Sequence, residues 1–186
     1  MAIAQIKSLS SESSQKDLFF SVLQILGASL LLALCSQIKV PLYFSPVPLS
    51  GQTLGVMLIG ATLGSRKGVL SVLAYLAEGS FGLPVFGSGS LGLLGPTGGY
   101  FLGFILQAYL VGWFTERQVS LQSTKTMTVL LSSCALQLGL GVLWLSFFVG
   151  FKLAMIMGLC PFLPGEVIKT MGVTAYLKAR SNKACC

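Results

Sequence analysis

Long apolar runs separated by short polar stretches limit this chain to folds that lipid can solvate. Residues 18–38 make one run that is long enough to cross a bilayer as a helix, which takes about 20 predominantly apolar residues. Charged residues are only 9% of the sequence, whereas about a quarter of the residues in a soluble domain are charged. Because so few polar side chains cannot cover a water-soluble globule, we predict an integral membrane protein.

The same pattern predicts six helical segments. They are residues 18–38, 49–64, 68–78, 100–114, 127–149 and 164–177. The second and third segments are short for a full crossing, and Arg66 and Lys67 between them predict the turn of a helical hairpin that is tilted or partly embedded. The predicted fold class is therefore an all-α integral membrane protein with six transmembrane helices.

The positions of the basic residues predict how these helices are oriented. If the N-terminus is cytoplasmic and every segment crosses, nine of the 12 lysines and arginines fall on the inner side, as the positive-inside tendency requires. Both termini are then cytoplasmic and the irregular loops lie outside. We expect residues 1–17 to be a polar cytoplasmic tail, disordered or interfacial, residues 18–180 the membrane domain, and residues 181–186 a short C-terminal tail.

Two of the predicted outer loops are irregular. Residues 39–48 contain three prolines, which forbid a regular helix, and residues 79–99 are rich in glycine yet remain apolar. Non-helical backbone at membrane depth is tolerated where it is buried in protein or lines a cavity. Aromatic residues that flank the loops are expected to close an apolar pocket, although each alone is more often an interface anchor or a packing residue: Tyr43, Phe44, Phe81, Phe86 and Tyr100.

One polar pair stands in the last apolar segment. Pro164 and Gly165 mark the start of a helix, and Glu166 and Lys169 are three residues apart, which places both on one helix face. An ionisable group at bilayer depth costs about 2.5–3.5 kcal/mol to insert and usually faces a cavity or a substrate pathway. The alternative is a structural ion pair, but such a pair still has a desolvation penalty that apolar residues avoid. We therefore expect a ligand site, in which Lys169 binds a carboxylate or a polarised carbonyl and Glu166 accepts hydrogen bonds from N–H groups.

Other polar or small residues have two interpretations each. Gln52 and Thr53 are able to line the same cavity or to make an interhelical hydrogen bond. Glu78, at the end of a short segment, is expected to be solvated rather than ligating. Ser29 and Ala33 are four residues apart in the first segment, a spacing that permits close helix contact or arises by chance.

Several classes of function lack the residues that they need. The sequence contains no histidine and no cysteine pair at metal-ligand spacing, so we expect neither a metal nor another cofactor. It has no P-loop, so it does not bind ATP in that manner. No catalytic constellation is present, which argues against an enzyme. The net charge of +7 is too dispersed along the chain to indicate a nucleic-acid partner.

Five motifs in order along the chain carry a family resemblance. They are Ile38-Lys-Val-Pro-Leu42, Pro46-Val-Pro-Leu49 followed by Gln52-Thr53, Gly82-Leu-Pro-Val-Phe86, Leu94-Gly-Pro-Thr-Gly-Gly-Tyr100, and Pro161-Phe-Leu-Pro-Gly165. With these motifs the chain strongly resembles the BioY family, the biotin-binding S components of energy-coupling factor (ECF) transporters. The resemblance extends from the first predicted helix to the last.

The resemblance implies a multi-pass protein of a bacterial-type plasma (inner) membrane that captures extracellular biotin and delivers it inward. It also implies an ECF transmembrane coupling protein and two ATPase subunits as partners, which supply the ATP hydrolysis. Small residues on the first helix of such subunits meet the coupling protein, and this assigns Ser29 and Ala33 to a partner interface. An S component for another small vitamin or precursor is one alternative. A stand-alone facilitator is a second, although it would need a continuous polar lining that the later helices lack.

The resemblance also implies site residues. The family's last-helix motif usually reads Pro-Gly-Asp-x-x-Lys, and its acid and lysine, which contribute to the biotin site, match Glu166 and Lys169 with an acid one methylene longer. The Gln-Thr of the second helix matches Gln52 and Thr53. Some members carry an arginine in the glycine-rich loop, where this chain has only Gly and Ser in residues 87–90. The candidate biotin-binding residues are therefore Tyr43, Gln52, Thr53, Phe86, Ser88, Ser90, Tyr100, Glu166 and Lys169.

Overall fold

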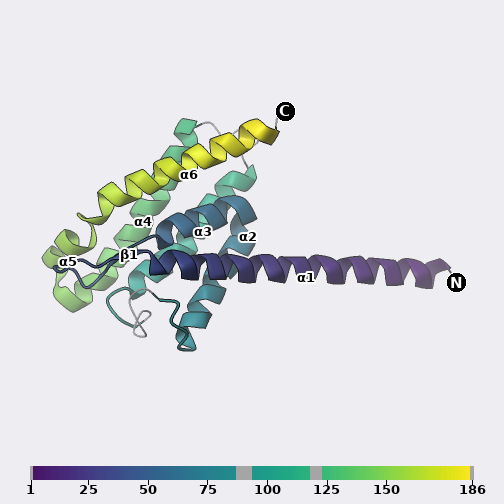
Figure 1. Cartoon of the computed structure of the whole chain (residues 1–186), viewed down its shortest axis with the longest axis horizontal. Helices are drawn as coiled ribbons and strands as arrows, with labels where there is room; N and C mark the ends of the chain where they lie inside the picture. Colours follow the sequence, from purple (N-terminus) through teal and green to yellow (C-terminus); the bar gives the residue numbers. More distant parts are fainter. Residues whose placement is uncertain (1, 87–93, 118–122, 185–186) are drawn as a thin grey trace.

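The computed structural model describes residues 2–86, 94–117 and 123–184. Its helices are α1 (Ala2–Gln37), α2 (Gln52–Ser80), α3 (Gly98–Arg117), α4 (Ser123–Val149), α5 (Phe151–Gly158) and α6 (Phe162–Ala184). Two short strands, β1 (Lys39–Val40) and β2 (Leu49–Ser50), pair antiparallel with Lys39 opposite Ser50. The six predicted helical segments fall largely within these helices (Figure 1), and α5 lies in the stretch between the fifth and sixth predicted segments, for which no helix was predicted.

Helix α1 begins much earlier than its apolar run predicts. Residues 2–17 continue the helix backward from the apolar segment, and Figure 1 shows this N-terminal part extending past the other helices. The stretch contains neither glycine nor proline, so no residue in it has a strong tendency to interrupt a helix. The segment that we expected to be a disordered or interfacial tail is helical from Ala2 in this structure.

Helix α2 folds back on itself at Gly64, whose φ of 82° and ψ of −178° break the helix. A Cβ on Gly68 would lie 3.2 Å from the Cα of Gly60, so the two arms are in close contact. Glu116 of α3 holds the turn, because its carboxylate accepts hydrogen bonds from the backbone N–H of Ser65 at 2.7 Å and from its hydroxyl at 2.8 Å. The helical hairpin predicted for this region is therefore present.

By length and apolar composition alone, three helices of the described part of the chain qualify as membrane-crossing segments, although one of them is the folded-back α2. They are Gln15–Gln37, Gln52–Ser80 and Thr124–Val149. The pair Phe151–Gly158 and Phe162–Ser181, bent by 42°, would make a fourth if it counts as one span. This number is smaller than the six crossings that we expected, in part because two of the predicted crossings are the short arms of α2.

Glycines allow α3 to pack closely against both of its neighbours. A Cβ on Gly60 of α2 would lie 2.8 Å from the backbone oxygen of Ala108, and a Cβ on Gly103 would lie 2.8 Å from the Cα of Gln137 in α4. Helix α3 therefore lies between α2 and α4, and α6 packs against α4 and α2. From residue 18 onward, most of the large apolar side chains that α1 exposes are leucines, which suits contact with lipid tails of similar polarity.

Candidate functional site

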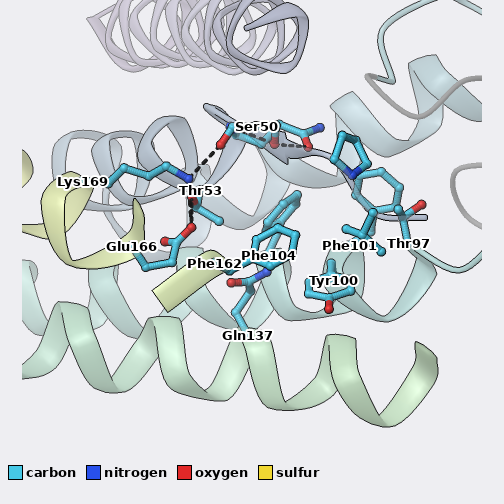
Figure 2. Close-up of a pocket in the computed structure, with 13 residues that line it drawn as sticks. Ser50, Thr53, Thr97, Tyr100, Phe101, Phe104, Gln137, Phe162, Glu166 and Lys169 are labelled. Atoms are coloured by element: carbon cyan, nitrogen blue, oxygen red, sulfur yellow. Dashed lines mark hydrogen bonds and ion pairs between the residues drawn. The ribbon is translucent and has the colours of Figure 1, made fainter. Parts of the chain in front are cut away.

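A narrow cavity of about 40 Å³ lies where the first turns of α2, α3 and α6 meet the middle of α4 (Figure 2). Strand β2 and the residues just before it also contribute to the wall. The lining residues are Val47, Pro48, Ser50, Gln52, Thr53, Thr97, Tyr100, Phe101, Phe104, Gln137, Phe162, Glu166 and Lys169. The wall thus combines aromatic rings with a few polar groups, as ligand pockets usually do.

Lys169 and Glu166 form an ion pair in this wall, with Nζ 2.9 Å from Oε1. The ammonium also donates to the backbone oxygen of Ser50 and to the hydroxyl of Thr53, both at 2.7 Å. Thr53 in turn donates to Oε1 of Glu166 at 2.8 Å. An ammonium has three N–H donors, so Lys169 has all of them engaged. A ligand oxygen binds Lys169 only by sharing or replacing one of these partners.

The two carboxylate oxygens of Glu166 have different partners. Oε1 accepts the hydrogen bonds from Thr53 and Lys169, whereas Oε2, within the described residues, accepts only from the thiol of Cys134, at 3.5 Å. A thiol is a weak donor, and Glu166 is only 2% exposed. Oε2 therefore retains the capacity to accept a hydrogen bond from an N–H group in the cavity.

Gln52 lines the cavity and also makes a hydrogen bond between the two arms of α2, which the sequence analysis treated as separate helices. Its Nε2 donates to the hydroxyl of Tyr75 at 2.5 Å, and its Oε1 accepts from the hydroxyl of Ser50 at 2.9 Å. Tyr75 then donates to the backbone oxygen of Val85 at 3.1 Å, which connects this part of the wall to the segment after α2. The two alternatives that the sequence left open for Gln52 are therefore both present in the geometry.

Aromatic rings make up the apolar part of the wall. Tyr100 donates from its hydroxyl to the backbone oxygen of Gly158 at 2.8 Å, and its ring stacks on Phe162 with the centroids 5.8 Å apart. Phe101 and Phe104 also line the cavity, and the sequence analysis did not single them out. Their spacing with Tyr100 is that of apolar residues on one helix face, and this spacing is the signal that identifies them.

Among the described residues, the candidates Tyr43 and Phe86 do not line this cavity. Phe86 is buried behind the wall, with its ring centroid 4.8 Å from that of Phe101. Tyr43 is fully exposed on the loop between the two strands. Ser88 and Ser90 lie outside the described residues.

Ser29 and Ala33 face the interior of this chain and not the outer surface of α1. Both are buried, and Ala33 belongs to the core cluster that α1 shares with α2. The hydroxyl of Ser29 donates to Glu78 at 2.7 Å, so Glu78, which we expected to be solvated, is half-buried and accepts this bond. The close helix contact that their spacing permits is therefore made with α2 of the same chain.

Nearly the whole chain is similar to one protein family. Residues 8–184 match the BioY family. The chain belongs to the BioY family. It is 35% identical over 164 residues to the biotin transporter BioY2 of Lactococcus lactis subsp. cremoris (strain MG1363), which covers 86% of this chain and 88% of that protein. It is 37% identical over 180 residues to the biotin transporter BioY of Rhizobium etli, which covers 90% of this chain and 93% of that protein.

A solved structure has a fold similar to that of this chain. It is the crystal structure at 2.1 Å of the S-component for biotin from an ECF-type ABC transporter. The two structures match with a TM-score of 0.79 at 26% sequence identity, over 90% of this chain and 93% of that chain. The resemblance to the BioY family that the five motifs indicated is therefore confirmed.

Proposed function

We propose that this member of the BioY family is the biotin-binding S component of an ECF transporter. It captures biotin outside the cell and delivers it inward, while partner subunits hydrolyse ATP. The observation that carries the proposal is the cluster of buried Glu166 and Thr53 with partly buried Lys169 in an aromatic cavity, in a chain whose relatives are named biotin transporters. Biotin combines an apolar fused ring and chain with a ureido group and a carboxylate, and a mostly apolar wall with a few polar groups suits such a ligand.

The proposed site consists of Glu166, Lys169, Thr53, Gln52 and Tyr100, which all line the same cavity. Oε2 of Glu166 accepts a hydrogen bond from a ureido N–H group, because it has the spare acceptor capacity described above. The ureido carbonyl oxygen accepts a hydrogen bond from the Lys169 ammonium, and it shares or replaces one of the present partners of that ammonium. The ring of Tyr100 packs against the apolar part of the ligand, since its hydroxyl is already engaged elsewhere.

The cavity has to widen before biotin enters. A volume of about 40 Å³ holds only about three water molecules, and biotin is a bicyclic acid. Residues 47–50 border the cavity and are attached through a pair of strands that are each two residues long. Because so short a ladder holds this segment, we expect it to move when the ligand binds.

The proposal places the chain in a bacterial-type plasma (inner) membrane with both termini cytoplasmic. In support, the N-terminal end of α1 and the C-terminal end of α6 point to the same side of the molecule (Figure 1). The sequence has no P-loop, so ATP hydrolysis is assigned to other subunits. We expect these to be an ECF transmembrane coupling protein and two ATPases.

Binding of radiolabelled biotin to the purified full-length chain in detergent tests the proposal. The variants are Lys169→Ala and Glu166→Gln, with Lys152→Ala as the matched control, because Lys152 is an exposed lysine of α5 that does not line the cavity. We expect wild type and Lys152→Ala to bind tightly and each site variant to bind roughly 10- to 100-fold more weakly, the loss expected for a hydrogen bond to a charged group.

Two outcomes contradict parts of this proposal. Unchanged affinity in both site variants would place the biotin site away from α6. No binding by folded wild-type protein would reject biotin as the ligand and favour another small vitamin or precursor.

A further inference from the structure

Gln137 of α4 is a cavity residue that the sequence analysis did not identify. It is only 2% exposed, and within the described part of the chain its Oε1 has no hydrogen-bond partner. Figure 2 shows the side chain rising from α4 toward the cavity, which Phe104 and Phe162 also line. A buried acceptor without a partner destabilises a protein unless something in the cavity satisfies it.

The packing of α3 against α4 limits the orientation of this amide. A Cβ on Gly103 would lie 2.8 Å from both the Cα and the Cγ of Gln137. The backbone of α3 is thus in close contact with the base of the Gln137 side chain, which restricts rotation of this side chain about its first torsion angle. Because Gln137 lines the cavity in this packing, part of the entropy cost of ordering its side chain is met before any ligand enters.

A second acceptor, Oε2 of Glu166, contacts α4 at a residue one helical turn before Gln137. Cys134 precedes it by three residues on α4 and contacts Oε2 of Glu166 at 3.5 Å. Residues three apart on a helix are neighbours on one face, with about 5–6 Å between their Cβ atoms. Oε1 of Gln137 and Oε2 of Glu166 therefore form a pair of acceptors on the same cavity, and both lack a strong donor within the described residues.

Two acceptors from different helices on one cavity suit a ligand with two N–H donors that point in different directions. The N–H groups of a cyclic urea point away from each other on either side of the carbonyl group. We propose that Oε1 of Gln137 accepts a hydrogen bond from one ureido N–H group of the ligand while Oε2 of Glu166 accepts from the other. Gln137 is then a specificity-determining residue that selects the intact urea, an inference that rests on the proposed biotin-binding function.

The site selects against ligands that lack one of the ureido N–H donors. A site that is built to bond an N–H group rejects analogues that lack it, because its own buried polar group then has no partner. Methylation of the ureido nitrogen that faces Gln137 removes the donor and also brings a methyl group against the amide. Loss of the sulfur from the ligand leaves the urea intact and does not affect this contact.

Gln107 provides a matched control for a substitution at Gln137. It is 1% exposed, and its Oε1 also lacks a partner among the residues that the structure describes. Its Nε2 donates to the Cys134 thiol at 3.2 Å, but it does not line the cavity. The variants Gln137→Met and Gln107→Met therefore remove the same amide from two similarly buried positions, of which only one faces the ligand.

The experiment measures affinities of the full-length wild type and both variants for four ligands. These are biotin, desthiobiotin, and the two biotin derivatives that are methylated on one or the other ureido nitrogen. We expect Gln137→Met to weaken biotin binding by about three- to tenfold, as for one neutral hydrogen bond, and Gln107→Met to change it less than twofold. The preference for biotin over one of the two methylated derivatives should shrink in Gln137→Met alone, with the biotin-to-desthiobiotin ratio unchanged.

The outcomes separate this inference from the function on which it rests. If wild type binds biotin but Gln137→Met keeps the affinity and the discrimination of wild type, the role of Gln137 is rejected and the proposed function stands. Equal losses in both variants, with unchanged ligand preferences, would make Gln137 a packing residue. If folded wild type does not bind biotin, both proposals fail together.

Discussion

Carboxylates from two other helices contact the two ends of the first arm of α2, Glu116 of α3 at one end and Glu166 of α6 at the other. These two carboxylates have different hydrogen-bond partners. Glu116 lies at the hairpin turn, where its two oxygens accept from the backbone N–H and the hydroxyl of Ser65. Glu166 lies at the other end, where Oε1 accepts from Thr53 and Lys169 and Oε2 is contacted only by a thiol within the described residues. Glu116 is exposed, whereas Glu166 is almost completely buried.

The hydrogen-bond partners of each carboxylate indicate its role. At the turn, both oxygens of Glu116 have strong donors from one residue, so the group acts as a cap that holds a local structure. In the cavity, Glu166 combines a lysine from its own helix with a threonine from a distant one and still has acceptor capacity left. A buried carboxylate with strong hydrogen-bond donors on only one of its oxygens is able to bind a ligand through the other. Such an arrangement lowers the stability of the fold, and the variants below measure by how much.

The largest effect is expected from removing the cation of the buried pair. Lys169→Ala leaves Glu166 as an uncompensated buried charge, and breaking such a pair typically costs about 3–5 kcal/mol. The double variant Lys169→Met/Glu166→Leu removes both charges and should recover most of the lost stability, because no unpaired charge remains. Thermal unfolding of the purified proteins in detergent measures both effects.

This prediction has a clear contrary result. A double variant that melts as low as Lys169→Ala would show that packing around the two side chains, and not the unpaired charge, determines the loss of stability.

An intermediate effect is expected at the turn that Glu116 holds. In Gly64→Ala the new Cβ would lie 2.2 Å from Oε1 of Glu116, and the residue has a φ of 82°. Gly82 has a similar φ of 87°, and among the residues that the structure describes no atom lies within 4 Å of a Cβ there, so Gly82→Ala is the matched control for backbone strain alone. We expect a loss of about 2–4 kcal/mol for Gly64→Ala and about 1 kcal/mol for Gly82→Ala, from strain with and without loss of the cap.

Thermal unfolding distinguishes these two glycine variants. Equal melting temperatures would mean that Glu116 moves aside without cost, and the cap would then contribute little to the hairpin.

The smallest effect is expected from removing the cap itself. Glu116→Ala should lower stability by about 1 kcal/mol, the usual value for a lost cap, and leave the biotin affinity of the folded protein within twofold of wild type. The same substitution at Glu166 should abolish tight binding. Calorimetric titration of both variants with biotin checks this contrast, and a tenfold loss of affinity in Glu116→Ala would show that the turn and the site are coupled.

Local patterns in the sequence were sufficient for the helices and for part of the site. Hydropathy located the apolar segments of α1, α3, α4 and α6, and the glycine at the centre of α2 lies next to the predicted hairpin turn. The length of α1 was not predicted, because the polar residues 2–17 give no apolar signal and yet contain nothing that ends a helix. The three-residue spacing of Glu166 and Lys169 predicted a pair on one face, and that pair is present.

Sequence by itself therefore determined the membrane class, the family and the polar pair of α6, because hydropathy, motif order and helical spacing are properties of neighbouring residues. Only the tertiary structure brought Thr53 and Ser50 to the Lys169 ammonium, across 116 and 119 positions of sequence. It alone turned Ser29 and Ala33 inward and placed the amide of Gln137 in the cavity wall. These arrangements depend on which helix faces pack together through close contacts such as that of Gly103 with Gln137, and no local pattern encodes the partner of a helix face.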